Sequence, residues 1–124
     1  MLFDPMKTIE RREGGPVIEL QPDPIPTDPN RKRLVVLTYG LLAARALDAK
    51  FEDERHMGAE VGIRRYILAT RIVAAEYPID LSIEEAQMVK ECTCKAYAPA
   101  LFAPIHLALD AAAKGPELST NAPA

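Results

Sequence analysis

Residues 78–85 read Pro-Ile-Asp-Leu-Ser-Ile-Glu-Glu, and they mark where one helix must end and the next can begin. Pro78 cannot continue a preceding helix, because it lacks a backbone N–H and its ring clashes with the previous turn. Ser82 and Glu85 have the spacing of a capping box, in which the Ser82 hydroxyl accepts from the Glu85 N–H and the Glu85 carboxylate accepts from the Ser82 N–H. The segment therefore predicts a helix on each side of a short connection.

Apolar side chains recur at helical spacing on both sides of this connection. Before Pro78, the spacing over residues 59–77 predicts a helix with one core-facing stripe. After Ser82, a second helix is expected to continue until Pro99, because its apolar residues again fall three and four apart. The expected inner positions are Ile63, Tyr66, Ile67, Thr70, Val73, Ala74 and Tyr77 in the first of these helices, and Ile83, Ala86, Val89, Thr93 and Ala96 in the second.

Two further helices complete the expected fold. One is expected at about residues 34–51, which are rich in leucine and alanine, and the other at about residues 101–113. Gly115-Pro116 is typical of a helix end, so residues 115–124 are expected to form a flexible C-terminal tail. A chain of 124 residues suits one domain. We therefore expect a mainly α fold, in which residues 31–114 form a small bundle of about four helices.

The first thirty residues differ from this helical body. Residues 1–30 hold six of the eleven prolines, and the run from Pro22 to Pro29 can be neither helix nor central strand, so an extended N-terminal arm and linker is expected. Residues 7–11 and 16–20 flank Gly14-Gly15 and predict a short β-hairpin, and residues 21–30 are expected to be an extended linker. A lone hairpin is marginal in water, so an ordered hairpin must lean on the helical body or on a partner. We expect the arm to dock on a partner. The candidate partner-binding residues are Phe3, Ile9, Val17, Ile18, Leu20 and Ile25.

The charge distribution argues against a polyanion as the main partner. The net charge of −3 arises entirely in residues 1–30, which hold three basic and six acidic side chains, whereas residues 31–124 hold twelve of each. Binding to nucleic acid needs a clustered excess of Lys and Arg. Two short basic runs nevertheless support an alternative hypothesis, a small nucleic-acid-binding regulator. Its phosphate contacts would be Arg31, Lys32, Arg33, Arg64 and Arg65.

Catalytic and metal-binding patterns do not stand out from the rest of the chain. The thiol and imidazole side chains are Cys92, Cys94, His56 and His106. A zinc site needs four converging ligands, whereas two cysteines that are two residues apart on a helix point to different faces. The sequence contains neither the Gly-x-Ser-x-Gly of a nucleophile elbow nor a glycine-rich phosphate loop. We therefore expect a protein without enzymatic activity, catalytic residues, metal or cofactor.

The sequence also favours a cytoplasmic location. No apolar run approaches the roughly eighteen residues of a membrane helix, and the start Met-Leu-Phe-Asp-Pro lacks the basic segment of a secretory signal. The spacing of Cys92 and Cys94 prevents a disulfide between them on a helix, which fits a reducing compartment. We expect no membrane partner.

Several short motifs follow one another between residues 37 and 110. They are Leu37-Thr38, an acidic turn at residues 51–54, Arg64-Arg65-Tyr66, the capping segment at 80–85, Val89-Lys90 and Tyr97-Ala98-Pro99. In this layout the chain resembles small all-helical proteins of unassigned function encoded by tailed bacteriophages and prophages. The resemblance implies a phage context and no assigned activity.

These observations favour a non-enzymatic bacteriophage structural or assembly protein that acts by protein–protein contacts. Its arm would dock on neighbouring phage subunits or on other copies of itself, with residues 16–20 adding a strand to an exposed sheet edge. Its expected location is the host bacterial cytoplasm, or the virion if it is incorporated there. Two alternatives remain open, the nucleic-acid-binding regulator described above and an inhibitor of a host protein such as a defence factor.

Overall fold

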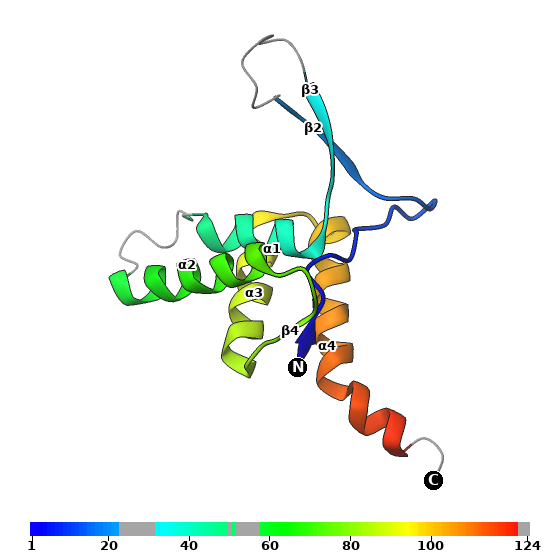
Figure 1. The fold of residues 1–124 in the computed structure, drawn as a ribbon, viewed down its shortest axis with the longest axis vertical. Coiled ribbons are helices and arrows are strands. Elements are labelled where there is room, and N and C mark those ends of the chain that lie inside the picture. The colour runs from blue at the N-terminus through cyan, green and yellow to red at the C-terminus, as the bar shows by residue number, and fades with distance from the viewer. Residues whose placement is uncertain (23–31, 50, 52–57, 122–124) are drawn as a thin grey trace.

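The computed structural model describes residues 1–22, 32–49, 51 and 58–121. In this part of the chain the fold is mainly α, as the sequence predicts, and the helices form a small bundle (Figure 1). The helices are α1 (Tyr39–Asp48), α2 (Ala59–Ala74), α3 (Ile83–Ala96) and α4 (Pro99–Asn121). The strands are β1 (Leu2–Phe3), β2 (Ile18–Pro22), β3 (Lys32–Val36) and β4 (Ile79–Asp80).

Helix α1 lies at the centre of the body, where it contacts both α2 and α3, and α3 packs in turn on α4 (Figure 1). Three alanines of α1 are buried, and their small side chains allow close helix packing. The core is formed by buried apolar residues from every helix and from the N-terminal segment. These include Phe3, Ile9, Leu37, Leu42, Ala43, Ala44, Ala46, Leu47, Leu68, Ile72, Leu81, Val89, Ile105 and Leu109.

The N-terminal segment is part of this core, which corrects the expectation of an arm that must find its order elsewhere. Strand β1 pairs antiparallel with β4, with Phe3 opposite Ile79. Phe3 is 1% exposed and Ile9 is 0% exposed. The Ile9 N–H donates to the Leu37 carbonyl at 2.9 Å, and the Ile9 carbonyl accepts from the Val17 N–H at 2.9 Å. The helical body therefore covers these apolar side chains itself, and Phe3 and Ile9 are not available to a partner.

The strand pairing differs from the expected hairpin. The expected turn is present, since Gly14 and Gly15 have φ angles of 98° and 85° and Glu10 bridges to Pro16. The longer pairing, however, joins β2 to β3 in antiparallel register. Residues 32–36 are therefore a strand, although a helix was expected from Leu34.

Two features explain why α1 begins later than expected. Residues 34–36, Leu-Val-Val, favour a strand because branched side chains fit a pleated surface. Thr38 then caps the helix, and its Oγ1 accepts from the Leu41 N–H at 3.1 Å. Of the expected linker at 21–30, only Gln21 and Pro22 are described, and both lie in β2.

In α2 the sequence predicts the helix correctly and its buried face wrongly. The side chains that face the core belong to Arg65, Leu68, Ala69 and Ile72. All seven residues of the expected inner stripe are instead exposed, namely Ile63, Tyr66, Ile67, Thr70, Val73, Ala74 and Tyr77. The helix has two apolar faces, and the narrower one packs on the alanine-rich α1, because Ala69 permits the close approach that bulky side chains would prevent.

Helices α3 and α4 follow the expectations more closely. The capping box at Ser82 and Glu85 is present, and Ala86, Val89 and Thr93 are buried, while Ile83 and Ala96 are exposed and do not belong to the inner face. Helix α4 continues through Gly115-Pro116 to Asn121. The expected end near Ala113 is therefore wrong. Pro116 has a φ that suits a helix but removes one backbone hydrogen bond. The helix propensity of the alanines before it helps to offset that loss.

Candidate interaction surfaces

The β2–β3 hairpin stands off the helical body (Figure 1). In its register Ile18 lies opposite Val36, and Leu20 lies opposite Leu34. Because side chains alternate between the two faces of a strand, Ile18, Leu34 and Val36 share one face. Ile18, Leu34 and Val36 are exposed, and Leu34 shows 69% of its surface. We call these three residues the hairpin face.

The base of the hairpin is tied to the body. Glu19 lies on the face opposite to Ile18, and its Oε2 accepts from Arg45 Nη1 of α1 at 2.8 Å. The pKa of the nearby Tyr97 hydroxyl is raised, mainly because burial disfavours the phenolate and also because Glu19 is negative, although Arg45 opposes the shift. The Leu37 N–H donates to the Val17 carbonyl at 2.9 Å and closes the hairpin at its base. The contacts at the base therefore fix the direction in which the hairpin leaves the body.

The edges of the hairpin are open for strand pairing. Within the described residues β2 and β3 form a sheet of two strands, so each has one edge that no other strand of that sheet covers. An uncovered edge presents backbone N–H and C=O groups that can pair with another strand. The hairpin thus combines open edges with an exposed apolar face.

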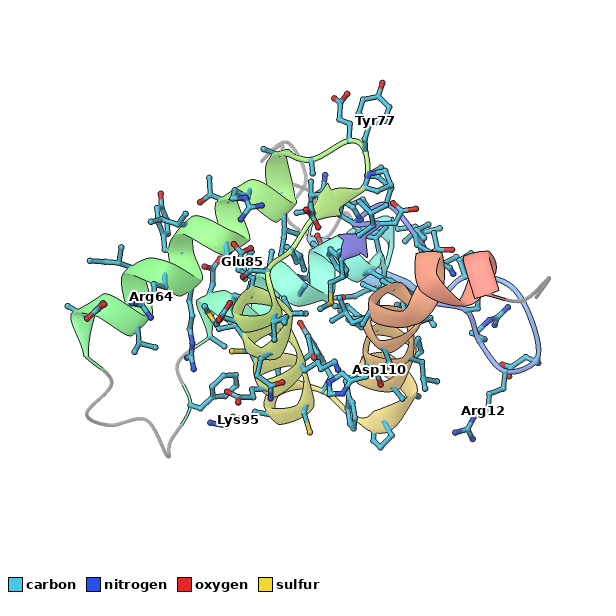
Figure 2. The ribbon with its side chains drawn as sticks, turned by 90° about the horizontal axis from the view of Figure 1, so that it is seen from below. Arg12, Arg64, Tyr77, Glu85, Lys95 and Asp110 are labelled. Carbon is cyan, nitrogen blue, oxygen red and sulfur yellow. The ribbon has the colours of Figure 1, made fainter. Side chains whose placement is uncertain are left out.

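A second apolar surface runs along α2. Ile63, Tyr66, Ile67 and Val73 are exposed, and so is Tyr77, which follows the helix. Tyr66 shows 67% of its surface, Val73 71% and Tyr77 76%. Figure 2 shows α2 along one side of the molecule, with Tyr77 pointing away from the body. We define the α2 outer face as Ile63, Tyr66, Ile67, Thr70, Val73, Ala74 and Tyr77.

The charged residues that flank this face are engaged within the chain. Arg64 donates to Glu60 at 2.7 Å. Arg71 pairs with Glu85 and also donates to the Asp80 carbonyl at 3.2 Å. Burial alone would raise the pKa of the Glu85 carboxyl, but the Ser82 backbone N–H and the positive charge of Arg71 outweigh burial and lower it. The cations beside the α2 outer face are therefore neutralised by carboxylates of the same molecule.

Two shallow grooves border the α2 outer face. One has a volume of about 270 Å³, and its lining includes Asp48, Tyr66, Thr70 and Val73. The other, on the α3 side, has a volume of about 330 Å³ and is lined partly by Arg64, Ile67 and Met88. Side chains of a docking helix could enter these grooves, so the face offers shape as well as apolar area.

Of the basic residues in the alternative hypothesis, those that the structure describes are not all exposed on one surface. Arg65 is 7% exposed and lies against the core, so its proposed role as a phosphate contact is wrong. Arg64, next to it in sequence, is exposed and paired with Glu60. Arg33 is exposed on β3, Lys32 belongs to the same strand, and Arg31 lies outside the described residues. A helix separates the side chains of residues 64 and 65 because consecutive positions point about 100° apart.

Cys92, Cys94 and His106 belong neither to the hairpin face nor to the α2 outer face. Cys92 is buried and Cys94 is exposed, which agrees with the divergent directions expected on a helix. His106 Nε2 lies 2.9 Å from the Lys90 carbonyl and 3.3 Å from Thr93 Oγ1, and His56 lies outside the described residues. In the part of the chain that the structure covers, no three His, Cys, Asp or Glu side chains are grouped so that they could hold a metal ion. None of the helices described there is long and apolar enough to cross a membrane.

Only part of the candidate partner-binding set is exposed. Phe3 and Ile9 are buried, Val17 is half-buried against the core, and Ile18 is exposed. Leu20 lies in β2, and Ile25 lies outside the described residues. Leu34 and Val36 are not among the predicted partner-binding residues, because the sequence pattern from residue 34 onward predicts a helix. Every member of the α2 outer face is predicted, but as part of the core.

Comparisons with known protein families, with curated proteins and with solved structures find no match for this chain. Its function is therefore argued from the two exposed apolar surfaces.

Proposed function

We propose that this chain is a non-enzymatic bacteriophage structural or assembly protein that acts through protein–protein contacts, with the β2–β3 hairpin as its docking element. The observation that carries the proposal is the position of the hairpin, which stands off the body with Ile18, Leu34 and Val36 exposed (Figure 1). A side chain such as Leu34 buries little apolar surface on folding in this position, because it remains 69% exposed. Its burial against a neighbouring subunit would contribute about 1.5–3 kcal/mol.

Strand addition is the mode of docking that fits this hairpin best. The open edge of β2 supplies backbone hydrogen bonds, and alternate side chains of the same strand supply apolar contact. The pairing of Glu19 with Arg45 holds the base of the hairpin in place, which reduces the ordering cost that binding must meet. The docking element is therefore shorter than the arm expected from the sequence, and it lies beyond the segment that is buried in the core.

The phage context rests on the resemblance of residues 37–110 to small phage and prophage proteins. That segment supplies helices α1 to α3 and the first half of α4, which form the body that carries the hairpin. The combination of a folded body with a projecting docking element suits a protein that joins other subunits.

A double substitution on the hairpin face tests the proposal. Ile18→Asp with Leu34→Asp places two charges where a partner would have to bury them, while both side chains are exposed in the free protein. A phage that carries this variant should yield at least about tenfold fewer infectious particles, and electron microscopy should show incomplete particles.

The matched control is Arg12→Ala, an exposed position in the turn before the hairpin (Figure 2). This variant should assemble normally. Normal particle yield from the Ile18→Asp, Leu34→Asp variant would show that the hairpin face is not the docking element.

A further inference from the structure

We propose that the α2 outer face is a self-association surface, on which α2 of a second copy of this chain packs antiparallel about a two-fold axis that passes near Thr70. The proposal rests on α2 and its flanks alone, so it holds or fails independently of the role of the hairpin. Three observations support it, namely the area of the face, the charges around it and the symmetry of its residues.

The first observation is area. If each of these large side chains has on the order of 150–250 Å² of surface, then Ile63, Tyr66, Ile67, Val73 and Tyr77 together expose on the order of 500–800 Å². The largest apolar patch on a typical monomer is about 300–600 Å². A stable dimer buries about 800 Å² on each partner. The α2 outer face therefore lies near or above the upper end of what a monomer usually leaves open, and it approaches what a dimer needs.

The second observation is charge. The seven residues of the α2 outer face carry no charge, and the flanking Arg64 and Arg71 are paired with Glu60 and Glu85. A partner of strongly acidic or basic character would find no unpaired opposite charge among these flanking groups. A second copy presents the same neutral stripe and the same internally paired flanks. Two such faces can therefore approach each other without like-charge repulsion.

The third observation is the distribution of large and small side chains about Thr70. In an antiparallel pair centred on this residue, Ile67 faces Val73 of the second copy, and Tyr66 faces Ala74 of the second copy. A bulky ring thus meets the smallest side chain of the face, which favours interdigitation. The same residues serve both partners, as a two-fold interface requires.

A charge in the middle of the face tests the association. Val73→Glu alters an exposed residue, so the fold should persist, which circular dichroism would verify. Sedimentation velocity should detect a dimer for the wild-type chain and a dissociation constant at least about 100-fold higher for Val73→Glu. Leu107→Glu, an equally exposed apolar position on α4, is the control and should remain dimeric.

Two results would overturn the self-association. In the first, sedimentation velocity would find the wild-type chain monomeric at every protein concentration measured, which would assign the face to a different protein. Alternatively, Val73→Glu could leave the dimer intact, which would place the interface elsewhere.

A disulfide tests the two-fold axis itself. Thr70→Cys in a Cys94→Ser background places a thiol close to its symmetry mate, so mild oxidation should yield a covalent dimer on a non-reducing gel. Ala111→Cys, an exposed position on α4, should not cross-link under the same conditions. Equal cross-linking of both variants, or none at residue 70 in a chain that dimerises, would contradict the antiparallel register.

Discussion

At Gly40 the fold leaves no room for a side chain. A Cβ built on this residue would lie 2.6 Å from the Cβ of Pro5 and 2.8 Å from its carbonyl oxygen, which accepts from the Gly40 N–H at 2.9 Å. Gly40→Ala should therefore destabilise the protein by about 1–3 kcal/mol, since the backbone of the N-terminal segment must move. Urea unfolding measures this loss. Gly58→Ala is the control, because a Cβ there meets nothing within 4 Å, and equal losses in both variants would contradict the close contact.

Glu85 links two helices through its charge. Its carboxylate accepts from the Ser82 N–H at 2.9 Å and pairs with Arg71 of α2. Because its pKa in the folded chain lies below the ordinary value of 4.5, the charge adds stability that is fully present above pH 4.5 and is lost as the pH falls through the folded pKa. Glu85→Gln should cost about 1 kcal/mol at pH 7 and almost nothing in acid below that pKa.

Thermal unfolding at a series of pH values measures this difference. Glu84→Gln removes a charge from the same first turn of α3 but leaves the cap and the Arg71 pair in place, so its effect should be smaller. If the difference between wild type and Glu85→Gln were the same at pH 7 and in acid, the charge of Glu85 would not be its source.

Gly40 and Ser82 also illustrate which residue-scale features could be predicted from the sequence. The Ser82 cap is local, since both of its partners lie within four residues, and it was predicted correctly. The need for glycine at residue 40 depends on Pro5, which is far away along the chain, and no local pattern indicates that contact. Helical propensity alone marks Gly40 only as unfavourable.

At the scale of the element, α2 shows what periodicity can and cannot decide. Apolar spacing located the helix, because any face with that spacing favours helix. It could not decide which of two apolar faces meets the core, since that choice depends on the alanine-rich surface of α1. The residues of the candidate surface were thus found, while their exposure was not.

Adjacent residues on opposite faces of α2 provide a direct test of this assignment. Leu68 is buried and Ile67 is exposed. Leu68→Ala should cost about 2–5 kcal/mol of stability, and Ile67→Ala should cost less than about 1 kcal/mol. Both should be measured by urea unfolding in the Val73→Glu background, where association does not contribute. The reverse order of effects would restore the face predicted from the sequence.

The hairpin should be separable from the body. Because the Leu37 N–H bonds to the Val17 carbonyl, residues 18–36 can be replaced by Asn-Gly, which forms a two-residue turn between paired strands. The Glu19–Arg45 pair is lost, at a cost of about 0–1 kcal/mol, so the shortened chain should keep a cooperative thermal transition. A chain that loses helical circular dichroism after this replacement would show that the hairpin belongs to the core.

At the scale of the whole molecule, the protein is a helical body whose N-terminal segment closes its own core and whose hairpin projects from it (Figure 1). The mainly α class could be predicted, because caps and helical spacing are local signals. The burial of Phe3 and Ile9 could not, because it depends on pairing with residues 79 and 37. Pro16 and Pro22 lie in extended chain, as the prolines predict, but prolines give no information on what that chain contacts.

The proposed functions of the molecule depend on two of its surfaces. Two surfaces, the hairpin face and the α2 outer face, each bring several exposed apolar side chains together, although other large apolar residues such as Leu2, Ile83 and Leu107 are also exposed. We infer that one joins the protein to a neighbouring subunit and the other to a second copy. A protein with two such surfaces could link subunits in series during assembly.

Amide hydrogen exchange tests the docking of the hairpin most directly. Alternate N–H groups of β2 and β3 point to the open edges, and in the purified protein they should exchange rapidly. In phage particles or assembly intermediates that contain the protein, the outward amides of β2 should exchange at least about tenfold more slowly, because strand addition would engage them. Unchanged exchange across residues 18–22 in the assembled state would contradict the account.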